Sequence, residues 1–126
     1  MSTRSQVHMI NTGVYLYQHM DGYNLAEEVQ IALKKKERWD DPEYLTRIIF
    51  ATMLKENNAV DGTLSYGIGT EEHGDIQYLV NVNTLSQRVI VLNKRYGQGW
   101  KTLLDEPFEE YIKMDVSAQK LGVCFN

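Results

Sequence analysis

Two short segments of the chain each place a histidine two residues before an aspartate, close to a glycine and a tyrosine. The first holds His19, Asp21 and Tyr23, and the second holds His73 and Asp75. Histidine titrates near neutral pH, so beside a carboxylate it could contact a ligand, bind a divalent metal or exchange a proton. We expect each segment where a strand meets a loop. Either the two segments converge on one pocket, or both are ordinary turn sequences.

A row of aromatic side chains leads up to the first of these segments. In the strand expected over residues 14–19, alternate side chains share a face, so Tyr15 and Tyr17 lie on the same side as His19. The intervening apolar side chains then face the core. Aromatic rings beside titratable groups are suited to stacking on a planar ligand.

Basic side chains offer contacts for an anion. Arg4 enters the first expected strand, where its guanidinium could donate two parallel hydrogen bonds to a phosphate or a carboxylate. The alternative is a solvated charge near the N-terminus. Arg88, Lys94 and Arg95 flank the most hydrophobic expected strand, and they are equally consistent with charges that protect a sheet edge from pairing.

The familiar catalytic and cofactor signatures are absent from the sequence. It contains no glycine-rich phosphate loop, no nucleophile elbow and no zinc-protease helix motif, and the G-x-G of residues 67–69 precedes acidic residues. Cys124 is the single cysteine, which excludes an internal disulfide and a multi-cysteine metal site, and we interpret it as a buried or incidental thiol. We therefore expect no cofactor and no metal ligands, and the sequence favours a protein without catalysis.

The remaining pattern predicts strands in hairpins, with helices between them. A glycine turn at residues 11–13 joins two β-branched and aromatic runs, and Asp41 followed by Pro42 is typical of a helix start. Period-two and helical patterns predict strands over 6–10, 14–19, 64–68, 76–83, 88–93 and 100–104, and helices over 24–33, 42–56 and 107–114. The order β-β-α-α-β-β-β-β plus a C-terminal element predicts an α+β fold, an antiparallel sheet with its helices packed on one face.

Composition and charge narrow the class of protein. The 126 residues are 43% apolar with a net charge of −4, which is typical of one globular domain over residues 1–126. No apolar run approaches the roughly 20 residues that span a bilayer and no signal peptide is visible, so we expect a cytoplasmic protein without membrane contact. The acidic balance disfavours binding to duplex nucleic acid.

Three motifs stand in order along the chain: S-T-R-S at residues 2–5, H-M-D-G-Y at 19–23, and H-G-D with a following tyrosine at 73–78. Together they resemble a group of short proteins of phages, prophages and other mobile elements, which carry T-R-[SA], H-W-D-G-Y-P and H-G-D motifs. Met20 stands in place of the family's tryptophan and Asn24 in place of its proline, so no stacking role is carried over for that tryptophan. The resemblance implies a phage or prophage origin and no established reaction.

We hypothesise a phage- or prophage-encoded, non-catalytic accessory protein that counters host defence by capturing a small anionic or nucleotide-like ligand. Its pocket would be completed by a homo-oligomer, and the expected ligand contacts are Arg4, Tyr15, Tyr17, His19, Asp21, Tyr23, His73 and Asp75. One alternative is an acidic inhibitor that binds a host defence protein through carboxylates at residues 71–72 and 105–110. Another is a hydrolase or phosphodiesterase that uses the two histidine–aspartate segments.

Overall fold

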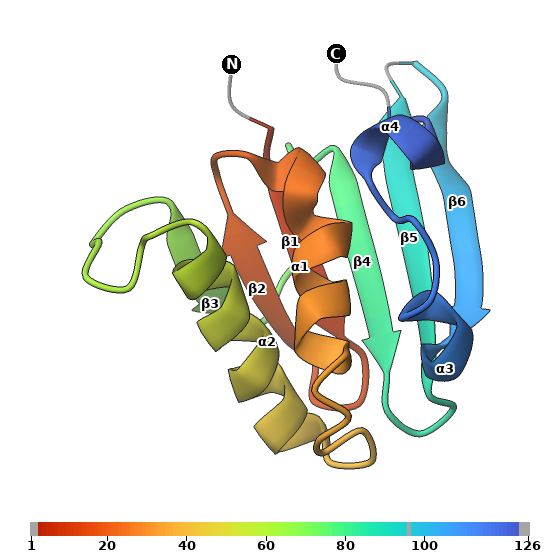
Figure 1. Cartoon of the computed structure of the whole chain (residues 1–126). Helices are drawn as coiled ribbons and strands as arrows, with labels where there is room; N and C mark the ends of the chain where they lie inside the picture. Colours follow the sequence, from red (N-terminus) through yellow and green to blue (C-terminus); the bar gives the residue numbers. More distant parts are fainter. Residues whose placement is uncertain (1–2, 96, 124–126) are drawn as a thin grey trace.

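The protein is a six-stranded sheet with helices along one of its faces (Figure 1). The computed structural model describes residues 3–95 and 97–123. The strands are β1 (Ser5–Met9), β2 (Val14–Gln18), β3 (Tyr66–Gly69), β4 (Tyr78–Asn83), β5 (Arg88–Arg95) and β6 (Gly99–Pro107). The helices are a 3₁₀ turn η1 (Gly22–Asn24), α1 (Leu25–Leu33), α2 (Pro42–Glu56), α3 (Phe108–Tyr111) and α4 (Ala118–Leu121). The α+β class and the order of elements expected from the sequence are confirmed.

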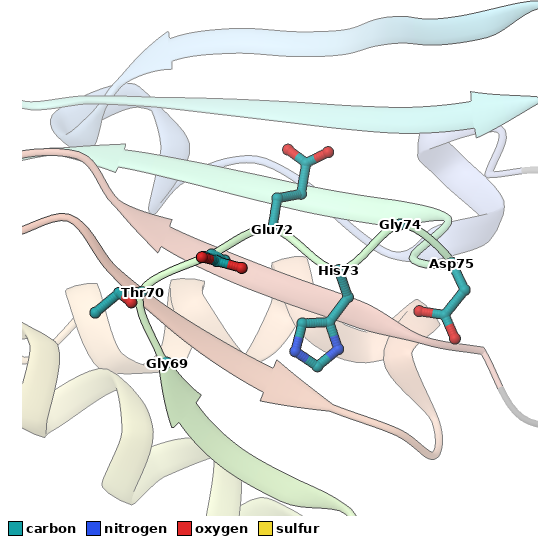
Figure 2. A pocket seen from close by; sticks show the side chains of 7 residues that line it. Gly69, Thr70, Glu72, His73, Gly74 and Asp75 are labelled. Atoms are coloured by element: carbon teal, nitrogen blue, oxygen red, sulfur yellow. The ribbon is translucent and has the colours of Figure 1, made fainter.

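One parallel pair of strands sets the topology of the sheet, whose spatial order is β3-β2-β1-β4-β5-β6. Every neighbouring pair is antiparallel except β1 and β4, in which Val7 lies opposite Val80. Because β3 adds to the outer side of β2 and β4 pairs with β1, the connection over residues 70–77 must cross two strands. This segment, which we call the strap, runs over the face of the sheet opposite the helices (Figure 2).

The helix-covered face of the sheet forms the core. Alternate residues of β1, β2 and β4 point into it, and the apolar stripes of α1 and α2 cover them. Val7, Leu16 and Val80 are completely buried from the sheet side, as are Val29 and Ile49 from the helices. Since these strand residues alternate, the side chains between them point to the opposite face. That second face carries the candidate site.

The C-terminal element consists of two short helices packed on the same side as α1 and α2 (Figure 1). The Tyr111 hydroxyl donates to the Ala26 carbonyl at 2.6 Å, which ties α3 to α1 inside the core. Cys124, interpreted above as an incidental thiol, lies outside the described residues. In the described part of the chain, no helix combines the length and apolar character needed to cross a bilayer.

The position of β5 corrects one interpretation of its charges. This strand lies between β4 and β6, so the edges of the sheet are β3 and β6. Arg88, Lys94 and Arg95 therefore do not protect an edge, and that interpretation was wrong. Arg88 pairs with Asp105 of β6 at 3.0 Å, while the other two lie at the opposite end of the strand.

Candidate functional site

The face of the sheet opposite the helices carries rings from two neighbouring strands. His8 of β1 lies opposite Tyr15 of β2, and their rings stack at 4.1 Å with an interplanar angle of 7°. On the outer side of β2, Gly69 of β3 lies opposite Tyr15 and Gly67 lies opposite Tyr17. A methyl group built on either glycine would contact nothing within 4 Å. The sheet beside the two tyrosines is therefore bare of side chains.

A buried glutamine fastens the strap over this face. The Gln6 side chain, only 1% exposed, donates from Nε2 to the Glu71 carbonyl at 3.2 Å and accepts at Oε1 from the His73 amide at 3.0 Å. A carboxamide that donates and accepts in this way satisfies two backbone groups of a segment without regular structure. The strap therefore has a defined position across β1 and β2 (Figure 2).

Tyr17 brings the two histidine–aspartate segments together. Its ring stacks on that of His73 at 4.5 Å and 29°, and its hydroxyl forms a hydrogen bond with His19 Nδ1 at 3.0 Å. The histidines of both segments thus meet on one tyrosine. With His8 beside Tyr15, all 3 histidines of the chain lie on this face.

An ion pair fixes the far end of the strap. Arg4 Nη1 donates to Asp75 Oδ2 at 2.7 Å, and both side chains are about half exposed. Two residues after Asp75, the Gln77 amide donates to the carbonyl of the same Arg4 at 2.9 Å. The arginine expected to pair with a ligand therefore already binds a carboxylate of the protein, and the aspartate of the second segment contacts arginine rather than histidine.

Asp21 and Tyr23 lie apart from this group. Asp21 adopts a left-handed backbone conformation with φ 54° ahead of η1, and its negative charge acts on Glu28 and Tyr66 on the helix side of the sheet. Tyr23 is partly buried within η1. The turn at Asp21 therefore separates the first segment's aspartate from its histidine.

No family model matches the chain. The curated proteins and the solved structures gave no match either. The chemistry of the site must therefore be argued from its own geometry.

A surface hollow of about 610 Å³ lies along the strap and is lined by residues 69–75. Its charged side chains are Glu71, Glu72 and Asp75, all exposed, and His73 is the one imidazole among them (Figure 2). Three carboxylates and a single arginine partner give this hollow a negative potential. Among the described residues, no group of three or more histidine, cysteine, aspartate or glutamate side chains is arranged to hold a metal ion.

The surroundings favour the neutral forms of three rings on this face, those of His8, Tyr15 and Tyr17. Burial lowers the pKa of His8, against smaller opposing contributions from Asn81 and Glu72. Burial raises the pKa of Tyr15, and the Glu72 charge adds to that shift. The pKa of Tyr17 is also raised by burial and by Asp75, with Arg4 acting in the opposite direction. At neutral pH the two tyrosines are therefore uncharged hydroxyl donors and acceptors.

The observed contacts favour binding over proton transfer. His19 bonds to a tyrosine hydroxyl and Asp75 to an arginine, so the histidine–carboxylate contact that orients a general base is not formed by either segment. What the face does present is two ring pairs, bare strand backbone and exposed carboxylates. These features suit a planar group with hydrogen-bond donors at its edge.

Two residues of this site were not predicted from the sequence, although the alternation of side chains in their strand indicates them. Gln6 and His8 alternate with Val7 and Met9 in an expected strand, so they must share the face opposite the core. The alternation that places Tyr15 and Tyr17 on one face of the next strand holds for these two residues as well. Pairing the two strands as a hairpin would have placed His8 beside Tyr15.

Proposed function

We propose that the protein is a non-catalytic binding protein that captures a small nucleotide-like molecule on the open face of its sheet. The observation that carries this proposal is the position of Tyr17 between His19 and His73, next to the stacked pair of His8 and Tyr15. Stacking on aromatic rings is a sequence-tolerant way to hold a nucleobase, and one ring adds about 1–3 kcal/mol to the binding free energy.

The geometry beside the tyrosines supports a flat ligand. Gly67 and Gly69 leave the space beside Tyr17 and Tyr15 without side chains, and the strap forms one wall of that space. A nucleobase inserted there would contact a tyrosine ring and the bare backbone of β3. Bulky residues in β3 would fill the same space, whereas the two glycines leave it open for the base.

The charges in the hollow indicate which part of the ligand enters it. Glu71, Glu72 and Asp75 would repel a phosphate, but carboxylates accept hydrogen bonds from the exocyclic amino groups of bases. The base is therefore the part that faces the strap, and the anionic part lies outside this hollow. Adenine, guanine and cytosine carry such amino groups, whereas uracil and thymine do not.

The resemblance to phage and prophage proteins supports a biological setting for this activity. In that setting the protein acts in the host cytoplasm, where it sequesters a nucleotide used by a defence system. A homo-oligomer would enlarge the pocket, since a hollow this open encloses only part of a ligand. Light scattering during size-exclusion chromatography measures the oligomeric state.

Thermal unfolding and calorimetric titration with nucleosides, nucleotides and cyclic nucleotides test the proposal. A ligand at about 100 times its Kd stabilises the folded state by about 2.7 kcal/mol, which gives a clear rise in Tm. Y17L should abolish this rise, while Y44L, which alters a tyrosine on α2 that is 55% exposed, should keep it. If no member of the panel raises the Tm of the native protein, the proposal fails.

The two alternatives have less support. An acidic inhibitor would use carboxylates gathered on one surface, yet Asp105 pairs with Arg88, and Glu109 and Glu110 lie on a different element from Glu71. A hydrolase would need the histidine–carboxylate contacts described above, which the two segments do not make. Salt-dependent capture of a host protein, or turnover that is lost in H19A and H73A, would favour the first or the second alternative.

A further inference from the structure

The two edges of the sheet differ in how they are protected from pairing with another strand. β6 carries charges of both signs, ends at Pro107, and shifts its register with β5 between Val91 and Leu92. Charges, proline and an irregular register are features that keep an edge strand from pairing with another chain. β3 is shorter, and its sequence Y-G-I-G contains no charged residue and no proline. The β3 edge therefore lacks the protection that the β6 edge has.

Main-chain hydrogen-bonding groups of β3 point outward at this edge. The His19 amide donates to the Ser65 carbonyl at 2.8 Å, so the main chain of Ser65 faces β2. Because this direction alternates along an antiparallel strand, the two glycines of β3 also face β2, and the main-chain groups of Tyr66 and Ile68 point away from it. In the described part of the chain, no strand lies on that outer side. An added strand would find donors and acceptors there.

A second hollow, an apolar groove of about 310 Å³, follows the same edge between α2 and β3. Leu16 and Ile68 line it from the sheet, and Phe50 and Leu54 line it from the helix. Figure 1 shows α2 running along this side of the sheet. Ile68 is 65% exposed, although its side chain lies on the helix side of β3. Exposed apolar surface beside an open strand is typical of a protein interface.

The charges of α2 favour a second copy of the chain as the partner. The exposed charged side chains of this helix are two acidic and two basic residues: Glu43, Glu56, Arg47 and Lys55. The helix is therefore neutral, although the chain has a net charge of −4. A two-fold axis places two copies of α2 antiparallel, so that their helix dipoles oppose each other favourably. This edge is thus a surface on which two copies meet without net repulsion.

We infer that a second copy of the chain pairs with β3 in antiparallel orientation, which joins the two sheets about a two-fold axis at Ile68. Residues that pair across this axis must lie on the same face of the sheet, so one outward-pointing residue pairs with its own counterpart. Ile68 meets this condition inside the strand, whereas Tyr66 adjoins Ser65, where φ is 78° and the extended conformation ends. The two isoleucine side chains then cover the apolar groove.

This dimer completes the base site, a consequence that rests on the proposed function. The two β2 strands lie three strand spacings apart, about 14 Å, with the two copies of β3 between them. Gly67 and Gly69 of both copies form a floor without side chains, and Tyr15 and Tyr17 of each copy border it. His8 of β1 covers one side of the Tyr15 ring, and the other side is turned toward this floor. The second copy therefore supplies the facing row of tyrosines.

Light scattering during size-exclusion chromatography, over a dilution series, tests the dimer. The native protein should be dimeric, and I68K should be monomeric because it places two like charges together at the axis. T102K adds the same charge at an exposed position of the β6 edge and should remain dimeric. Unchanged Tm values verify that both variants fold. A native protein that is monomeric throughout, or an I68K protein that is as dimeric as the native one, would overturn the inference.

A cysteine at the axis tests the register independently. Opposed Cα atoms in a hydrogen-bonded antiparallel pair lie about 5.5 Å apart, within the range that a disulfide spans. I68C should therefore form a disulfide-linked dimer under mild oxidation, in a C124S background that removes the native thiol. T102C in the same background should not. Cross-linking of T102C without cross-linking of I68C would assign the contact to β6 and overturn the inference.

Titration of I68K with the nucleotide panel separates the dimer from the proposed function. The side chain at position 68 lies on the face opposite the tyrosines, so any loss of affinity in this variant reports loss of the partner. We expect binding to weaken by roughly tenfold, as for loss of one stacking ring. Native affinity in monomeric I68K would overturn the shared site and leave the base site of one chain in place. A β3 dimer that binds no nucleotide would contradict the proposed function and support the interface.

Discussion

The ring of His73 lies 4.5 Å from the ring of Tyr17 and covers one of its faces, although the two residues belong to distant parts of the chain. This stack is one of the side-chain attachments of the middle of the strap, together with the Gln6 carboxamide and the ion pair between Arg4 and Asp75. Exposed ring pairs and ion pairs contribute little to stability, so the buried glutamine should dominate.

Replacing Gln6 by leucine should release the strap. The substitution leaves the Glu71 carbonyl and the His73 amide without their partner, so we expect the free energy of unfolding to fall by about 2 kcal/mol. Hydrogen exchange of the strap amides should accelerate, while exchange in β4 and β5 stays slow. Q119L, at an exposed position of α4, is the control. Unchanged exchange at residue 73 in Q6L would show that the glutamine does not hold the strap.

Gly22 should be intolerant of any side chain. A Cβ atom built there would lie 2.2 Å from the Thr3 carbonyl oxygen and 2.5 Å from Ser5 Oγ, both on the strand side of the turn. G22A should therefore cost about 1–3 kcal/mol through overpacking, measured by denaturant unfolding. G74A makes a matched control, since a Cβ at Gly74 would contact nothing within 4 Å. Equal stability of both variants would mean that the turn is not packed against β1 as described.

Short-range patterns predicted the elements of this fold better than their long-range pairing. The alternation in residues 14–19 correctly separates Leu16, in the core, from Tyr15 and Tyr17 on the other face. The parallel contact between β1 and β4 depends on which edge a returning strand joins. That choice follows from packing of the whole sheet, so no local pattern indicates it.

The candidate site is likewise only partly visible in the sequence. The residue types and spacing indicate both histidine segments, but whether the segments meet depends on the course of the strap. Arg4 forms an ion pair with Asp75, which lies far along the chain. Only the tertiary fold shows this pairing. Asp21 lies apart from His19 because Asp21 itself adopts a left-handed backbone conformation, which an Asp-Gly sequence permits without requiring.

A buried carboxylate lies behind the turn that carries His19. Glu28 of α1 is 4% exposed, its Oε2 accepts from Asn57 Nδ2 at 2.9 Å, and its Oε1 has no partner among the described residues. The Gln18 side chain lies beside this carboxylate, and Gln18 Oε1 is also buried without a partner. Burial is the largest cause that raises the pKa of Glu28 to about 7. Hydrogen bonds from Asn57 and Gln18 oppose this shift, and the charges of Glu56 and Asp21 add to it.

Stability should therefore decline as the pH rises toward neutrality. The unfolded chain loses the Glu28 proton near its ordinary pKa of 4.5, while the folded state keeps it up to about 7. The contribution is fully present below pH 4.5 and is lost as the pH rises to about 7, by at most about 3 kcal/mol. E28Q should remove this part of the pH dependence, measured by urea unfolding across that range. E27Q, one residue earlier on α1, should retain it, and a native profile in E28Q would assign the effect to another group.

Valine at position 69 should separate ligand binding from folding. Gly69 lines the first hollow opposite Tyr15, and a side chain there has open space around it, so the folded sheet can accept one. Valine is favoured in strands, and we expect the Tm of G69V to equal or exceed that of the native protein. Its methyl groups would occupy the space proposed for the base and weaken nucleotide binding by at least roughly tenfold, as steric exclusion from a stacking site costs more than 1.4 kcal/mol.

The control is I68V, which changes the neighbouring residue on the opposite face of β3 and should bind as the native protein does. Native affinity in G69V would exclude this face of β3 from the binding site, whatever the ligand.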